Sequence, residues 1–289
     1  MKKFSLVGLV IFLVGLLLLV LGFIGTRHTD IQKALSSSVT NYDYRKDVTK
    51  FNRLEVSGNV DVEIVRGNKY AVHVYENKKN SVQAQVEDQV LKISNRQSTF
   101  NGNFVVKLNK NKLTFGSNMI VVTVPDNQLK SIEGNNTSGD LSISKLRFND
   151  GLNINGFNVG DIRLSQVTAK SLSVDSQSAD ITVADSSFTE NDSTVKSEDG
   201  DIRIRNSSFK TLNTSLTDGD AYLNGLKITN YLNVNNTDGD IYLTLSKHDN
   251  ANVYAHSNEG NVYGSASDHH NSHRHYRLIS EDGDIHLND

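Results

Sequence analysis

The chain has 289 residues, of which 37% are hydrophobic, and it contains no cysteine and a single proline. An apolar fraction this low argues against a compact globule with a thick core. The absence of cysteine excludes disulfides, thiolate catalysis and cysteine metal sites. The net charge of -3 divides unevenly, because residues 1–130 are basic overall and residues 131–289 are acidic overall. We interpret both halves as ordinary solvated surface.

The N-terminal segment is typical of a membrane anchor. Lys2 and Lys3 precede an uncharged, strongly apolar run over residues 4–25, which is long enough to cross a bilayer as one helix. A cleaved signal peptide is the alternative, but the end of the run matches the small-x-small cleavage pattern poorly. We therefore predict a single-pass anchor at residues 1–25 with a cytoplasmic N-terminus, an extracytoplasmic remainder and a juxtamembrane linker at residues 26–50.

Residues 51–130 alternate apolar and polar side chains, as half-buried strands do. Val60, Val62 and Ile64 are one example, and Pro125 ends the last apolar run. This region lacks the regular period of the residues that follow. We predict an all-β region that caps the first turn of a repeat array.

The repeat array at residues 131–289 is marked by a Gly-Asp-apolar tripeptide that recurs about every 20 residues, with Ala179-Asp180-Ile181 and Gly260-Asn261-Val262 as near copies. We call its central residue the anchor. The anchors are Asp140, Asp161, Asp180, Asp201, Asp220, Asp240, Asn261 and Asp284.

Pairs of alternating apolar residues recur at three positions around each anchor, which indicates three short strands per repeat. Ile241 and Leu243 follow one anchor directly, and Leu232 and Val234 precede the same anchor. Stacked hairpins would require an even number of strands per repeat. A three-sided β-solenoid accommodates all three pairs, so we predict an all-β solenoid with about 20 residues per coil.

The sequence resembles the bacterial putative-adhesin family of β-strand-repeat domains, and within it the LiaG-like membrane-anchored envelope proteins. The opening Phe51-x-x-Leu54-x-Val56, the strand that ends at Pro125 and the serial Gly-Asp-Ile-x-Leu units carry the resemblance. It implies a right-handed β-helix and a cell-surface setting, and it brings no catalytic residues.

Paired aspartates at the predicted corners are candidate calcium ligands, because stacked carboxylates repel one another and calcium prefers oxygen ligands. Solvated turn residues are the alternative, which we favour. The eight residues are Asp199, Asp201, Asp218, Asp220, Asp238, Asp240, Asp282 and Asp284.

The side chain two residues after each anchor is expected to point outward. Tyr222, Tyr242 and Tyr263 occupy this position in successive repeats and are our candidate binding face. Exposed aromatic rings can contact sugars or partner chains. The alternative is that the stacked tyrosines only stabilise adjacent coils.

A histidine-rich stretch interrupts the last repeat. Four histidines within seven residues could bind zinc or copper, but their spacing is irregular and a solvated loop is the alternative that we favour. They are His269, His270, His273 and His275.

No serine-hydrolase, zinc-protease or phosphate-loop motif is present. We therefore expect a protein that is not an enzyme, needs no cofactor and binds no nucleic acid. The predicted function is a membrane-anchored binding module for glycan, wall polymer or a surface protein. The alternative is a regulatory or structural accessory of the envelope stress response.

Overall fold

The computed structural model describes residues 42–76, 81–95, 106–109, 112–115, 118–158, 160–245, 249–265 and 272–288. The predicted anchor and most of the linker lie outside these ranges. Within them every regular element is a strand, and no helix is present that could cross a membrane. Residues 41–289 form one compact unit.

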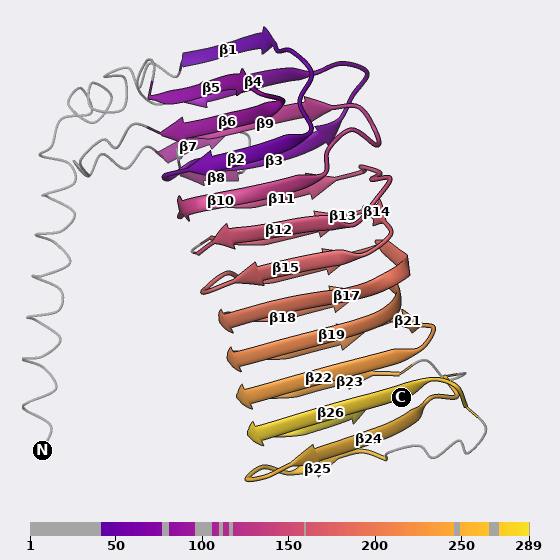
Figure 1. The fold of residues 1–289 in the computed structure, drawn as a ribbon. Helices are drawn as coiled ribbons and strands as arrows, with labels where there is room; N and C mark the ends of the chain where they lie inside the picture. The colour runs from indigo at the N-terminus through magenta and orange to yellow at the C-terminus, as the bar shows by residue number, and fades with distance from the viewer. Residues whose placement is uncertain are drawn as a thin grey trace, which may run out of the picture. The chain divides into compact units, whose positions relative to one another are not determined.

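Two large sheets build this unit (Figure 1). Sheet 1 contains, in spatial order, β1 (Tyr42–Asp47), β4 (Ala71–Glu76), β9 (Met119–Val124), β3 (Asp61–Arg66), β11 (Leu141–Ser144), β13 (Ile162–Ser165), β16 (Ile181–Ala184), β18 (Ile202–Arg205), β20 (Ala221–Asn224), β23 (Ile241–Thr244), β27 (Ile285–Asn288) and β25 (Val262–Tyr263).

Sheet 2 contains, from the opposite end, β24 (Asn252–Ser257), β26 (His275–Asp282), β22 (Tyr231–Asp238), β19 (Ser208–Asp218), β17 (Ser187–Asp199), β15 (Leu172–Ser176), β12 (Leu152–Phe157), β10 (Ser131–Thr137), β2 (Arg53–Ser57), β6 (Val90–Asn95) and β5 (Val82–Glu87). The short strands β14 (Thr168–Ala169) and β21 (Lys227–Ile228) pair with β17 and β19, and β7 (Val106–Asn109) forms a separate hairpin with β8 (Lys112–Phe115).

One strand of sheet 2 and the following strand of sheet 1 form a coil. Each of these strands pairs in parallel with the equivalent strand of the neighbouring coil. Ile202 faces Ala221, and Ala221 faces Ile241, so equivalent apolar positions form a continuous buried row. As predicted, residues alternate along these strands of sheet 1, and the apolar ones point toward the core.

The third predicted strand is paired in only part of the described array, at residues 168–169, 187–188, 208–209 and 227–228. Its ladder is only two residues long, as where Phe188 pairs with Phe209. Those two rings are fully buried and stack 5.3 Å apart. The apolar residues of the third position thus enter the core, but they pair over a shorter ladder than the strands of the two main sheets.

The array begins earlier in the chain than the sequence period indicates. β2 and β3 pair in parallel with β10 and β11, so residues 53–66 already form a coil. β6 and β9 stack on that coil in turn. Beyond them β1, β4 and β5 pair antiparallel with their neighbours and form the end of the stack, in the place predicted for a cap.

The coil order at the other end differs from the order in sequence. β26 and β27 pair with β22 and β23, while β24 and β25, which precede them in the chain, lie beyond them as the last coil. The final repeat in sequence is therefore inserted between two earlier ones.

The corner glycines allow this close stacking. Gly239 has a φ of 117°, and a Cβ atom there would lie 2.4 Å from the backbone oxygen of Gly219 in the neighbouring coil. Both the left-handed backbone and the contact exclude a side chain.

We expect Gly239→Val to lower the free energy of unfolding by more than about 3 kcal/mol, because strain and a backbone clash act together. Urea denaturation measures this. Gly151→Ala is the matched control, since the nearest atom is the movable Ser171 hydroxyl and the φ is not left-handed, and its cost should stay below about 1 kcal/mol. A Gly239→Val protein with unchanged stability would contradict the corner assignment.

Candidate functional site

The anchor aspartates form a hydrogen-bonded ladder along one corner of the stack. The Oδ1 atom of Asp201 accepts the backbone N–H of Asp220 at 2.8 Å, and Asp220 accepts that of Asp240 at the same distance. The same hydrogen bond joins further anchors in neighbouring coils, with the carboxylate acceptor named first and the N–H donor second: Asp61 and Asp140, Asp140 and Asp161, Asp180 and Asp201, Asp240 and Asp284, and Asp284 and Asn261.

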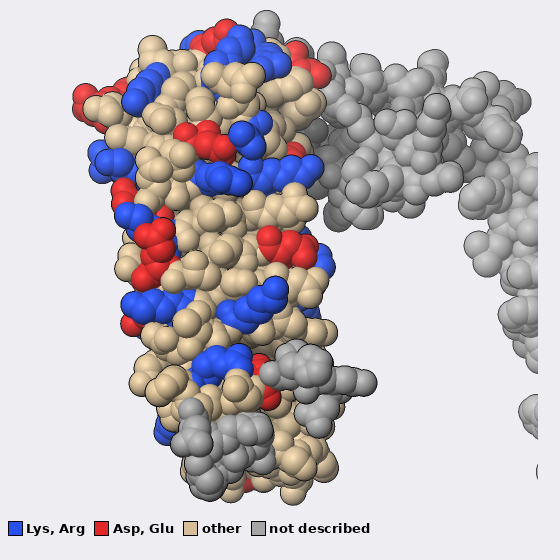
Figure 2. Space-filling view, turned by 90° about the vertical axis from the view of Figure 1, so that its right-hand side faces the viewer, with Lys and Arg blue, Asp and Glu red and all other residues tan. Residues whose placement is uncertain are grey.

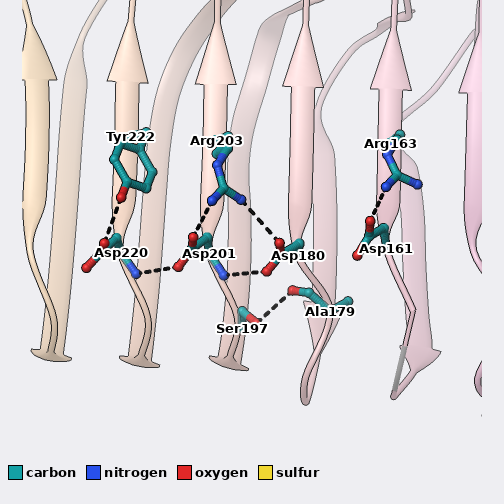
Figure 3. Close-up of polar contacts among 9 residues, drawn as sticks. All are labelled: Asp161, Arg163, Ala179, Asp180, Ser197, Asp201, Arg203, Asp220 and Tyr222. Atoms are coloured by element: carbon teal, nitrogen blue, oxygen red, sulfur yellow. Dashed lines mark hydrogen bonds and ion pairs between the residues drawn. The ribbon is translucent and has the colours of Figure 1, made fainter. Parts of the chain in front are cut away.

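Two arginines neutralise the ladder in the first part of the array. Arg203 contacts Asp180 at 3.2 Å and also contacts Asp201, so that one guanidinium joins two coils (Figure 3). Arg163 joins Asp140 and Asp161 in the same way. Burial raises the pKa of the Asp161 carboxyl, and Arg163 acts against this shift.

Two tyrosines replace the arginines farther along. The Tyr222 hydroxyl donates to Oδ2 of Asp220 at 2.7 Å, and the Tyr242 hydroxyl donates to Oδ2 of Asp240 at 2.8 Å. These hydrogen bonds, together with desolvation and the nearby carboxylates, raise the pKa of both phenols to about 12. The predicted aspartate and tyrosine rows are therefore one connected network, which the sequence did not indicate.

The aromatic row contains a member that sequence order hides. Tyr222 stacks on Tyr242 at 4.9 Å between ring centroids, Tyr242 stacks on His286 at 4.6 Å, and Tyr263 stacks on the far side of His286 at 4.9 Å. The interplanar angles are 3°, 5° and 14°. Tyr242 and Tyr263 are thus separated by one coil, because β27 lies between their strands.

Face-to-face stacking changes what this row can bind. Each inner ring covers the faces of its neighbours, so an external ligand reaches the ring edges and not the flat faces. Arg203 lies over the first ring, 5.1 Å from the Tyr222 centroid, in a cation–π contact. Tyr263 ends the row and is 48% exposed.

The eight candidate calcium ligands divide into two rows with different surroundings. Asp201, Asp220, Asp240 and Asp284 are half-buried members of the ladder, whereas Asp199, Asp218, Asp238 and Asp282 are exposed and face one another across successive strands. In the described parts of the chain no group of three or more His, Asp or Glu side chains is arranged to hold a metal ion. Because each ladder Oδ1 already accepts a backbone N–H, the calcium prediction gains no support here.

The histidine candidates are only partly described. His269 and His270 lie outside the described residues. His273 and His275 are exposed, and the His275 ring stacks on Tyr231 at 5.7 Å. The zinc or copper site stays a prediction.

Charged side chains of both signs are interspersed with wide uncharged areas on one face of the stack (Figure 2). No single-sign field dominates this view, which agrees with the solvated surface expected from the sequence.

The comparisons with known proteins agree with this architecture. The Toastrack DUF4097 family model matches residues 51–288. The chain belongs to this family. The predicted family resemblance is thereby confirmed, since solved structures similar to the chain are also named "putative adhesin". No curated protein matches the chain.

Two solved structures from Parabacteroides distasonis share the fold. One is named "putative adhesin" and has 16% sequence identity, a TM-score of 0.56 and coverage of 86% of this chain and 97% of that one. The other is named "putative lipid binding protein" and has 17% identity, the same TM-score and the same coverage of both chains. At these identities the likeness shows the fold alone.

We expect Asp201→Ala to lower the free energy of unfolding by about 1–2 kcal/mol, because it leaves the Asp220 N–H without its acceptor and removes one of the two carboxylates that Arg203 contacts. Asp218→Ala is the matched control, since Asp218 lies in the exposed row, and it should change stability by less than about 0.5 kcal/mol. Urea unfolding of both variants measures the difference. Equal effects would show that the ladder contributes nothing beyond surface charge.

Proposed function

We propose that this protein is a non-enzymatic, cell-surface binding module that contacts a glycan, a wall polymer or another surface protein. One observation carries the proposal: the stacked row of Tyr222, Tyr242, His286 and Tyr263 on the outward side of sheet 1. The row places a rigid aromatic strip beside a line of hydrogen-bonding carboxylates. Rigid aromatic side chains lose little conformational entropy when they bind.

The geometry favours an extended ligand. The strip crosses consecutive coils, so its repeat distance is the strand spacing of about 4.8 Å. Ring edges and neighbouring polar groups such as Asn224 and Thr244 are offered together. A polymer that lies along the stack meets these groups in series, and its affinity is the sum of many weak contacts.

We infer further that the array is a three-sided, right-handed β-solenoid. The in-register ladders of sheets 1 and 2 and the two-residue ladder through Phe188 and Phe209 support the three sides. The handedness rests on the family resemblance.

The proposed setting is the outer side of a cell membrane, with residues 1–25 as an uncleaved anchor. The support is the apolar run behind Lys2 and Lys3. A domain held there by its N-terminus presents its repeats to envelope components.

Single cysteines test this topology without background, because the natural chain has none. We expect Asn224→Cys, at an exposed position, to react with a membrane-impermeant maleimide on intact cells. Lys3→Cys should react only after permeabilisation. Labelling of Lys3→Cys on intact cells, or protection of Asn224→Cys, would contradict the proposed orientation.

The binding proposal is tested with a Tyr222→Ser/Tyr242→Ser/Tyr263→Ser variant of the full chain. We expect at least a tenfold loss of affinity for purified cell-wall sacculi or for ligands on a glycan array, because the aromatic strip is removed. Sedimentation with sacculi and array fluorescence measure it. Circular dichroism checks that the variant stays folded.

Two controls separate a binding role from a structural one. The Tyr→Phe triple variant keeps the stacked rings, and Tyr44→Ser/Tyr75→Ser removes exposed tyrosines at the other end of the stack. Both should bind more tightly than the Tyr→Ser variant. Unchanged binding by a folded Tyr→Ser variant would refute this face and favour the alternative role as an accessory of the envelope stress response.

A further inference from the structure

The C-terminal end of the stack leaves its core rows uncovered. Val262 occupies the same inward row as Ile241 and Ile285, which are fully buried, yet Val262 is 40% exposed. Ala255 follows Leu278 in the inward row of sheet 2 and is only half-buried, whereas Leu278 is 0% exposed. Both residues belong to the last coil, where no further coil covers them among the described residues.

The backbone of the last coil is equally open. β24 pairs only with β26, and β25 only with β27, in the described part of the stack. The N–H of Asn252 donates to the Arg274 carbonyl just before β26 at 2.9 Å, and the N–H of Asn258 donates to the Ser280 carbonyl in β26 at 3.1 Å. By the alternation of a parallel ladder, Val253, Ala255 and Ser257 direct their N–H and C=O groups away from β26, toward the open end.

The opposite end is built differently. Its edge strand β1 carries Asp43, Arg45, Lys46 and Asp47 and runs antiparallel to its neighbour. Charged edge strands prevent the addition of further strands. β24 has the sequence Asn-Val-Tyr-Ala-His-Ser and contains no Lys, Arg, Asp or Glu. In the described part of the chain the two ends are therefore not equivalent. The N-terminal edge strands β1 and β5 run antiparallel to their neighbours and both contain charged residues, whereas β24 runs parallel to β26 and contains none.

We propose that the open C-terminal end binds the same end of a second copy of this chain, with β24 of the two copies antiparallel around a two-fold axis at Ala255. Around that axis Val253 pairs with the partner copy's Ser257, and Ala255 pairs with its own equivalent. All three residues direct backbone groups to the interface and side chains to the core. The pairing therefore joins the backbone ladders and continues the apolar rows from one copy into the other.

Charge favours the two-fold arrangement over a parallel continuation of the stack. Glu259 follows Asp238 and Asp282 in the exposed acidic row, so parallel pairing of β24 with β24 of a second copy would place the two Glu259 side chains next to each other. The two-fold axis instead sends the acidic corner of each copy to the opposite end of the paired strands. The start of β26 lies there, where Arg274 contacts Asp249 at 3.2 Å.

The register of this interface is tested with single cysteines in the full chain, kept in mild detergent. Directly opposite Cα atoms of a hydrogen-bonded antiparallel pair lie about 5.5 Å apart, which suits a disulfide. We expect Ala255→Cys to form a disulfide-linked dimer under mild oxidation. Tyr254→Cys is the matched control, because its two copies are diagonal at about 7–8 Å, and it should give at least tenfold less dimer.

A second variant measures the affinity. Ala255→Pro removes an N–H that points to the open end and leaves the ladder to β26 intact. Sedimentation equilibrium should show a wild-type dimer whose dissociation constant rises at least tenfold in Ala255→Pro, while Tyr44→Ser at the other end behaves as the wild type.

Three results would overturn the proposal. They are a monomeric wild type at about 100 µM, equal cross-linking at positions 254 and 255, and an association that Ala255→Pro leaves unchanged, as dimerisation through residues 4–25 would be. A monomer would point to a strand of a different protein as the occupant of this end. None of these results depends on binding of sacculi or glycans, so the failure of either proposal can be recognised separately.

Discussion

The structure depends on one constraint: equivalent residues of successive coils lie directly above one another in parallel register. The anchor carboxylate enforces this register, because its Oδ1 accepts the backbone N–H of the next anchor, as between Asp201 and Asp220. A glycine precedes most of the anchors, and a Cβ atom at these glycines, as at Gly239, would enter the backbone of the neighbouring coil. Ala179 occupies this position before Asp180. Once the corner is aligned, every side chain meets its own equivalent one strand away.

Such alignment is favourable for apolar and aromatic residues and unfavourable for like charges. The ladder aspartates tolerate stacking because each accepts a backbone N–H and because Arg163 and Arg203 each join two of them. Beyond Arg203 the same position changes to Tyr222 and Tyr242, which donate to one carboxylate each and stack on each other. From Arg203 to Tyr222 this position thus exchanges a second ion pair for a ring-to-ring contact, while the hydrogen bonds between the anchors continue from Asp201 to Asp220 and Asp240.

Local periodicity was sufficient to predict the anchors, the inward apolar pairs and the all-β class, because each depends on residues only a few positions apart. It could not predict the order of coils. The sequence near Tyr263 does not indicate that the coil of His286 lies between Tyr263 and Tyr242, because the order of these coils depends on pairing between distant strands. The coil at residues 53–66 was not predicted for a related reason, because it stacks on β10 and β11, which lie far along the chain. A third strand per repeat was predicted from apolar pairs in the sequence, but the pairing there, as at Phe188 and Phe209, is only two residues long.

Stacking also determines where such a protein can interact. Within the array, ring faces and backbone groups are used by neighbouring coils, so the long sides offer only ring edges and polar side chains. A continuous strip on sheet 1 is consequently suited to a repeating ligand with many weak contacts. The ends of the array are different, because unpaired backbone groups and core residues are presented there together. β1, β4 and β5 close one end with reversed and charged strands, whereas the exposed Val262 and half-buried Ala255 leave the other able to extend the same core. In the two-fold pairing that we propose, each copy contributes the same edge strand, β24, so that the pairing joins two copies and presents no further β24 edge.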